Sequence, residues 1–72
     1  MFQIWINAPQ VEWVRAVTVI CHFGNVGEEE AKNRFQQRLH NPVLTGLSEE
    51  VAAAAVTEFH QIPGVRATAE AV

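Results

Sequence analysis

Proline and glycine interrupt this 72-residue sequence at short intervals, and these interruptions constrain its fold more than any motif does. Each such break stops a regular helix or strand. The segments between the breaks are typical, in order, of a strand, two helices, a short strand, a helix and a strand. We therefore predict a single α+β domain over residues 1–72. It would be a compact β-α-α-β-α-β two-layer sandwich, with three helices on a three-stranded antiparallel sheet. The breaks fall at Pro9, Gly24, Asn41-Pro42, Gly46 and Pro63-Gly64.

Both ends of the sequence are predicted to be strands. Residues 2–7, FQIWIN, alternate with a period of two, which is typical of a strand with one buried face. Residues 65–72, VRATAEAV, alternate in the same way and form the last predicted strand. Residues 43–45 are long enough only for a short strand between the helices.

The segment 10–24 allows two interpretations. Its many β-branched residues favour a strand by propensity alone. However, Pro9 suits the first turn of a helix and Gly24 suits its end, and apolar residues recur at helical spacing between them. We predict a helix here, while a strand would give a different fold.

The next two helices are marked by their first turns. Asn25 and Glu28 form a predicted capping pair at the start of a helix over residues 25–40. Ser48 is the predicted N-cap of a helix over residues 49–61, which has an alanine run at its centre. Glutamates lie in the first turn of both helices, where the helix dipole favours negative charge.

Spacing along these helices predicts which side chains face the core. Apolar residues three or four apart would form the buried stripes, and charged residues four apart would pair along the solvent face. The predicted stripes are Ala31, Phe35 and Leu39, and then Val51, Ala55, Phe59 and Ile62; the predicted charged row is Glu30, Arg34 and Arg38. The predicted core is Phe2, Ile4, Ile6, Trp13, Val17, Ile20, Phe23, Phe35, Leu39, Val51, Phe59 and Ile62.

Composition argues against several classes of partner. The net charge of −3 gives no basic patch for nucleic acid. The longest apolar stretch, residues 16–21, is far shorter than the roughly 20 residues of a membrane span, and the first ten residues do not resemble a signal peptide. A single cysteine, Cys21, forms no internal disulfide, and small secreted domains usually depend on disulfides. We therefore expect a cytoplasmic protein that binds neither nucleic acid nor membrane.

No pattern of residues points to a catalytic or metal site. His22, His40 and His60 match no spacing of paired metal ligands. Cys21 and His22 would point about 100° apart on a helix, and a free cysteine usually acts as a small buried hydrophobe. We therefore expect no cofactor and no enzymatic activity, and expect a macromolecular partner instead.

The order of elements and three stretches of sequence resemble the bacterial protease adaptor ClpS. FQIWIN resembles the first strand of that family, which ends in Asn; VEWVRAV resembles its first helix; GLSEEVAAAAV resembles its Gly-led third helix. That family binds the N-terminal residue of a protein and delivers the protein to a Clp ATPase. The resemblance implies a protein-binding adaptor whose partner is a Clp ATPase or its substrates.

The same resemblance assigns roles to individual residues. Asn7 would contact the α-amino group of the partner, and the side-chain pocket would be lined by Val11, Val14 and Phe35. Glu50 would contact the ATPase. The family also carries an acidic residue in the loop after the first strand, whereas residues 8–10 of this chain are Ala-Pro-Gln.

A second resemblance provides an alternative function. NVGEEEAKNRF is similar to the turn and helix start in the C-terminal domain of the bacterial ribosomal stalk protein, which has this fold and engages translation factors. The alternative is therefore a ribosome- or translation-factor-associated protein that uses the face around Lys32, Arg34 and Arg38. The simpler interpretation of these three residues is a solvated helix face.

Trp5 is the remaining candidate, because it falls on the face of the first strand opposite the apolar residues. It is either an exposed binding residue, a role in which Trp is common, or it packs against a terminal residue. A homodimer through Trp5 or the alanine run is a variant of either function. We predict a non-catalytic protein-binding adaptor or regulatory module. Its predicted contacts are Asn7, Val11, Val14 and Phe35, with Trp5 and Glu50 as secondary contacts.

Overall fold

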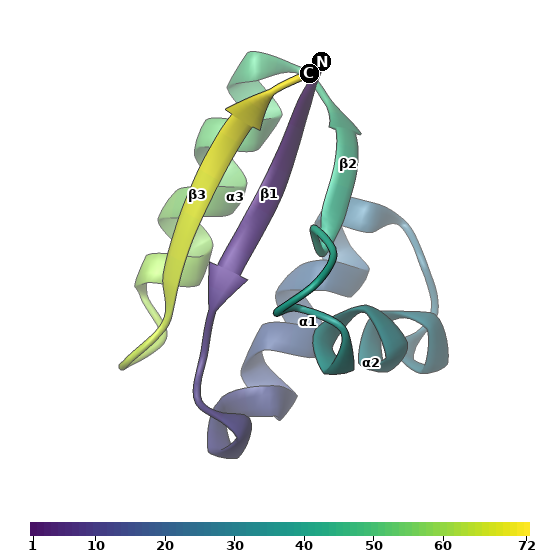
Figure 1. Ribbon diagram of the computed structural model, residues 1–72, viewed down its shortest axis with the longest axis vertical. Helices are drawn as coiled ribbons and strands as arrows, with labels where there is room; N and C mark the ends of the chain where they lie inside the picture. The colour runs from purple at the N-terminus through teal and green to yellow at the C-terminus, as the bar shows by residue number, and fades with distance from the viewer.

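The computed structural model describes all residues, 1–72, and has the predicted order of elements. Three helices lie on a three-stranded antiparallel sheet with strand order β2-β1-β3, so the α+β prediction is confirmed (Figure 1). A short 3₁₀ helix, η1, precedes α1. The elements are β1 (Phe2–Asn7), η1 (Gln10–Glu12), α1 (Trp13–Gly24), α2 (Glu28–Gln36), β2 (Leu44–Leu47), α3 (Glu49–His60) and β3 (Arg66–Ala71).

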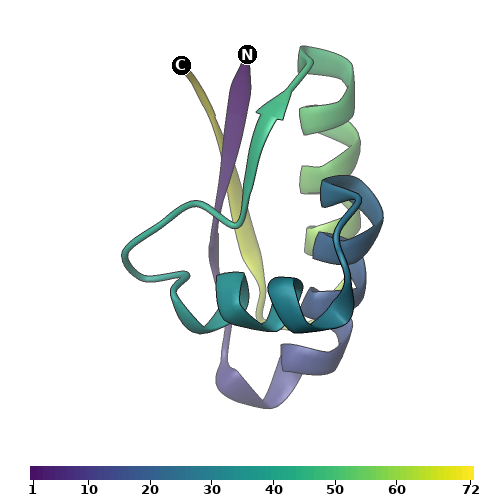
Figure 2. The same cartoon turned by 90° about the vertical axis from the view of Figure 1, so that its right-hand side faces the viewer.

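The sheet and the helices form two layers. Figure 2 shows the sheet nearly edge-on, with α1 and α3 on one side of it, while α2 packs against α1 and extends across the edge of the sheet. β1 is the central strand, and its two neighbours come from the second half of the chain. The two ends of the chain meet at one end of the sheet, where the amide of Val72 donates a hydrogen bond to the carbonyl of Met1 at 2.9 Å.

Residues 13–24 are helical, so the helical interpretation of this segment is confirmed and the strand alternative is wrong. Its β-branched residues do not prevent the helix, because Val17 and Ile20 are buried against the rest of the fold. Helices in proteins gain most of their stability from packing an apolar face rather than from propensity. Pro9 precedes η1 in an extended conformation, which turns the chain from β1 into the helical layer.

The predicted start and end of α2 need correction. Asn25 does not cap α2 but adopts a left-handed conformation (φ 52°) that ends α1. Gly27 occupies the N-cap position of α2 and provides no side-chain hydrogen bond. The helix ends at Gln36, not at residue 40. The predicted cap of α3 is confirmed, since the Ser48 hydroxyl accepts a hydrogen bond from the Val51 amide at 3.3 Å.

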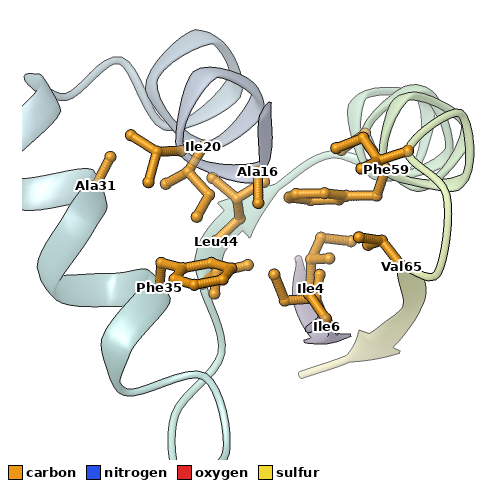
Figure 3. Close-up of a cluster of buried hydrophobic side chains, with 14 of the residues drawn as sticks. Ile4, Ile6, Ala16, Ile20, Ala31, Phe35, Leu44, Phe59 and Val65 are labelled. Carbon is orange, nitrogen blue, oxygen red and sulfur yellow. The ribbon is translucent and has the colours of Figure 1, made fainter. Parts of the chain in front are cut away.

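The core lies between the two layers and contains only apolar residues. Figure 3 shows side chains from all three helices meeting those of the sheet in one cluster. Because no polar side chain is buried, the core requires no internal hydrogen-bond network. The buried residues are Ile4, Ile6, Ala8, Ala16, Val17, Ile20, Ala31, Phe35, Val43, Leu44, Leu47, Ala52, Ala55, Phe59, Ile62 and Val65.

Two residues predicted for the core lie outside it. Leu39 is 74% exposed, because α2 has already ended and residues 37–40 turn away from the helix axis. Val51 is 39% exposed, since α3 is rotated so that Ala52 faces the sheet in its place. The other corrections are smaller. Phe2, Trp13 and Phe23 are only partly buried, although they pack against the core.

The helices are short. The longest, α1 and α3, have 12 residues each. None is long and apolar enough to cross a lipid bilayer.

Candidate functional site

A hollow of about 200 Å³ opens between α2 and the start of α1. Trp13 and Val17 lie one turn apart on α1, and Lys32 and Gln36 lie one turn apart on α2, so both pairs face the same gap. Three of its six lining residues are apolar or aromatic and three are polar. Its lining residues are Gln10, Trp13, Val17, Lys32, Phe35 and Gln36.

A cation lies over the largest aromatic ring of the hollow. The Lys32 ammonium is 5.0 Å from the centre of the Trp13 ring and 3.4 Å from a carboxylate oxygen of Glu28. The lysine side chain is 42% exposed, which weakens its pairing with Glu28 through solvent. The ammonium is therefore positioned by the ring and remains accessible to a negatively charged group of a partner.

Arg38 fixes one side of this hollow. Its Nε donates to the carbonyl of Ala8 at 3.0 Å, and its Nη1 donates to the carbonyl of Phe35 at 3.0 Å. The guanidinium also lies 4.1 Å from the centre of the Phe35 ring. One side chain therefore ties the segment after β1 to the end of α2.

The structure brings only some of the predicted contact residues to this hollow. Phe35 lines it from the core side, with 1% of its surface exposed. Val14 is 57% exposed on the outer face of α1 and lines a second hollow, of about 270 Å³, which Trp13 also lines. Val11 is 80% exposed on η1, next to Gln10, but lines neither. These residues form an apolar surface around Trp13 rather than one groove.

The other three predicted contacts lie elsewhere. Asn7 is exposed at the end of β1, where it pairs with Arg66 of β3. Glu50 is exposed in the first turn of α3. Trp5 lies on the face of the sheet away from the helices. None of the three lines the hollow next to Trp13.

Sequence reasoning missed Trp13 as a site residue and named Lys32 only for the alternative function. The helical spacing of Trp13 with Val17 predicts a core residue, and the ring does pack against the core, but it is only partly buried. The sequence places Lys32 beside Arg34 and Arg38, on a helix face that is either the contact of the alternative function or simply solvated. The helical spacing does place Trp13 with Val17 on one face of α1 and Lys32 with Gln36 on one face of α2. Nothing in the sequence indicates that these two faces turn toward each other.

Trp5 is held by a hydrogen bond on the open face of the sheet. Its indole Nε1 donates to Glu70 Oε1 at 3.0 Å, and the Gln3 amide donates to the same oxygen. Both donors favour the charged carboxylate, so the hydrogen bonds from Gln3 and then Trp5 lower the pKa of Glu70 below its ordinary value. Trp5 is partly buried in this arrangement, and its polar edge is already occupied.

The three basic residues of the alternative function all have partners inside the chain. Lys32 pairs with Glu28, and Arg34 pairs with Glu30 at 3.1 Å and reaches the Val43 carbonyl at 3.3 Å. The predicted pairing of Glu30 with Arg34 is thus confirmed. Arg38 lies beyond the helix end and bonds to carbonyl groups instead of extending the row.

Histidine and cysteine side chains are dispersed. No group of three or more His, Cys, Asp or Glu side chains is placed to hold a metal ion. Cys21 is partly buried, and the ring of His22 packs edge-on against Phe23 with centroids 4.9 Å apart. His60 accepts a hydrogen bond from the amide of Ala67.

Comparison with known proteins finds no matching protein-family model, no matching curated protein and no matching solved structure. The two resemblances described above therefore rest on the order of elements and on the quoted stretches of sequence.

Proposed function

We propose that this protein is a non-catalytic, cytoplasmic adaptor that binds a peptide or protein by receiving one apolar side chain in the hollow between α1 and α2. The supporting observation is the hollow itself, with Trp13 at its wall. Small-molecule and cofactor pockets usually measure about 300–1,000 Å³. A cavity of ~150 Å³ can hold benzene, so about 200 Å³ suits a single aliphatic or aromatic side chain.

The surface around the hollow supports a protein partner. Val11 and Val14 expose most of their apolar side chains beside it. Apolar contacts of this kind around a Trp are typical of the centre of a protein–protein interface, where a few residues provide most of the binding free energy. A partner that covers the hollow would also remove both valines from water.

The charges of the site favour one kind of ligand. Lys32 is the one charged residue that lines the hollow, with Glu28 paired to it from outside the lining, and the loop at residues 8–10 carries no carboxylate. A bound α-amino group would lose its hydration without gaining a negative partner, which is costly. The preferred ligand is therefore an internal apolar side chain with an acidic residue next to it, rather than the N-terminal residue that the ClpS resemblance implies. Delivery to a Clp ATPase, with Glu50 as a contact, remains a separate part of the adaptor hypothesis.

The ribosomal alternative has less support. It requires Arg34 and Arg38 as well as Lys32 to be free for a partner. Both arginines are engaged within the chain: Arg34 with Glu30 and the Val43 carbonyl, and Arg38 with the carbonyls of Ala8 and Phe35. A partner would have to replace those contacts before it gained any of its own.

Selection of short random peptides displayed on phage tests this proposal. The immobilised protein should enrich peptides that combine a large apolar residue with a nearby Asp or Glu. Trp13 then reports binding by fluorescence in a Trp5→Phe variant, which leaves a single indole in the chain. Binding should change the emission of that indole.

Matched charge changes locate the contact. Val14→Glu and Lys32→Glu should each weaken the selected peptides at least about tenfold, since one removes apolar contact and the other repels the acidic residue. Arg66→Glu makes the same charge change as Lys32→Glu but on β3, away from the hollow, and should leave unchanged the affinity for a soluble peptide that has a single apolar residue. Equal losses in Lys32→Glu and Arg66→Glu would reject the site, as would enrichment of peptides without an apolar residue.

A further inference from the structure

The two edges of the sheet differ in how they are protected. β2 has only four residues, Gly46 within it has φ 69°, and its pairing with β1 is irregular. β3 has six residues and pairs with β1 without interruption from Phe2–Ala71 to Asn7–Arg66. It contains no Pro, Gly or Lys, and no strand lies along its outer edge (Figure 1). Such an edge is available for pairing with another strand.

The backbone groups on this outer edge can be identified. In an antiparallel ladder, the N–H and C=O of one residue point to the same side, and successive residues alternate sides. Val72 donates to Met1 on the β1 side, whereas Ala67 donates to His60 Nε2 at 3.1 Å on the outer side. Ala67, Ala69 and Ala71 therefore present their backbone groups outward. Apart from the Ala67 N–H, none of these groups has a partner in the chain.

The side chains of β3 are arranged for pairing with a second copy. Read in either direction from Thr68, the strand has Ala on each side and then Arg66 at one end and Glu70 at the other. If two copies pair antiparallel with Thr68 opposite Thr68, each Arg66 lies opposite the Glu70 of the other copy. A shift of the centre to Ala67 or Ala69 destroys both charge pairs. Opposite charges directly across an antiparallel pair stabilise it.

The two charged groups are free for this contact. Arg66 is exposed, and its guanidinium forms no hydrogen bond or ion pair within the chain. Glu70 uses Oε1 for Trp5 and Gln3, which orients the carboxylate on the open face of the sheet and leaves Oε2 for a partner. The open face also holds Thr68. On β1, the cross-strand partners of Arg66, Thr68 and Glu70 are Asn7, Trp5 and Gln3, in that order.

We propose that the protein forms a symmetric homodimer through β3, in which the two sheets join into one six-stranded antiparallel sheet centred on Thr68. Ala67 and Ala69 of one copy exchange backbone hydrogen bonds with Ala69 and Ala67 of the other. The Ala67 N–H leaves His60 to do so. This interface is independent of the hollow between α1 and α2, and it uses neither the side chain of Trp5 nor the centre of the alanine run as its main contact.

α3 contributes the rest of the interface. His60 reaches the outer edge of β3, so the residues one and two turns before it, Val56 and Ala53, lie along the same side of the helix. Both are small, and Ala53 is exposed. Small side chains allow two helices to approach to about 8–10 Å, so α3 of each copy can pack against the other above the joined strands.

Cysteine cross-linking tests the register directly. Thr68 would form a non-hydrogen-bonded pair across the symmetry axis, with Cα atoms about 4.5 Å apart, which is within disulfide range. Thr68→Cys in a Cys21→Ala background should therefore form a disulfide-linked dimer under mild oxidation. Glu70→Cys in the same background is the matched control. The two copies of residue 70 would lie ~13 Å apart along the strands and should not cross-link.

Charge exchange tests the pairing without oxidation. Arg66→Glu and Glu70→Arg should each raise the Kd of the homodimer about tenfold or more, because both cross-strand pairs become repulsive. An equimolar mixture of the two variants should form the heterodimer, which has two attractive pairs, as measured by native mass spectrometry. Ala69→Pro removes an outward N–H but no bond to β1, so it should give a folded monomer.

Three outcomes would overturn the proposal. The wild type could sediment as a monomer up to millimolar concentration. This would exclude the homodimer, and the β3 edge would then be available only to a strand of another protein. Thr68→Cys and Glu70→Cys could cross-link equally, which would exclude this register. The mixture of charge variants could fail to form a heterodimer while each variant alone, shown to be folded by circular dichroism, behaves as the wild type does.

Discussion

Replacing Phe35 and Leu39 with alanine, one at a time, tests whether α2 ends at Gln36, as in the structure, or continues to residue 40, as the sequence pattern predicts. The two residues are four apart, so a continuous helix would bury both and both substitutions would be costly. In the structure Phe35 is 1% exposed and Leu39 is 74% exposed. Phe35→Ala should lower the free energy of unfolding by about 3–5 kcal/mol, as is usual for a buried aromatic ring. Leu39→Ala should change it by no more than about 0.5 kcal/mol.

The size of the domain makes an intermediate variant necessary. At about 0.05–0.15 kcal/mol per residue, a chain of this length has a free energy of unfolding of about 4–11 kcal/mol. Phe35→Ala could therefore leave too little folded protein to measure. Ile20 is completely buried, and Ile20→Val removes a single methyl group at a cost of about 0.5–1.5 kcal/mol. It should remain folded and still be clearly less stable than Leu39→Ala.

Urea and thermal denaturation, followed by far-UV circular dichroism, measure these differences. In a domain of this size, 1 kcal/mol shifts Tm by about 4–8 °C. Ile20→Val should lower Tm by about 2–12 °C, and Leu39→Ala by less than ~4 °C. A loss of more than about 2 kcal/mol in Leu39→Ala would show that Leu39 is buried. The end of α2 at Gln36 would then be wrong.

Three further substitutions or titrations test local features. Ser48→Ala should cost about 1 kcal/mol in urea denaturation, because it removes the N-cap of α3, and no measurable loss would contradict that cap. Asn25→Val should cost about 1–2 kcal/mol and Asn25→Gly much less, since the left-handed conformation that ends α1 disfavours a β-branched residue; equal effects would contradict it. The Trp5 indole proton should follow the ionisation of Glu70 in an NMR titration with a midpoint below 4.5, because Gln3 and Trp5 donate hydrogen bonds to the charged carboxylate. Because the pKa of Glu70 is lower in the folded than in the unfolded state, its hydrogen bonds stabilise the fold fully above the unfolded-state pKa. This stabilisation is lost as the pH falls through the lowered folded-state value. A midpoint at or above 4.5 would show that the hydrogen bonds do not form.

The two proposed surfaces lie on different parts of the molecule. The hollow belongs to α1 and α2, whereas the dimer would form through β3 and α3 at the other edge of the sheet (Figure 1). Dimerisation would therefore leave both hollows open. A partner with two apolar side chains at a suitable separation would bind such a dimer more tightly than it binds one copy.

The sequence by itself determined the elements whose signals are local. Alternation over a few residues sets the strands at residues 2–7 and 66–71, and the side chain of Ser48 reaches its own helix three residues on. The order of elements followed from these signals and from proline and glycine, which act on their immediate neighbours. From this order the fold class could be predicted, as could the placement of Trp5 opposite the buried face.

Tertiary structure decided what depends on contacts between distant segments. α2 ends at Gln36, where Arg38 can reach the carbonyl of Ala8 far back in the chain. The helical pattern gives no signal of that contact. Similarly, α3 buries Ala52 rather than Val51 because the sheet sets the rotation of the helix. The hollow beside Trp13 has the same origin: the spacing of residues fixes which side chains share a helix face, but only the packing of two helices decides which faces meet.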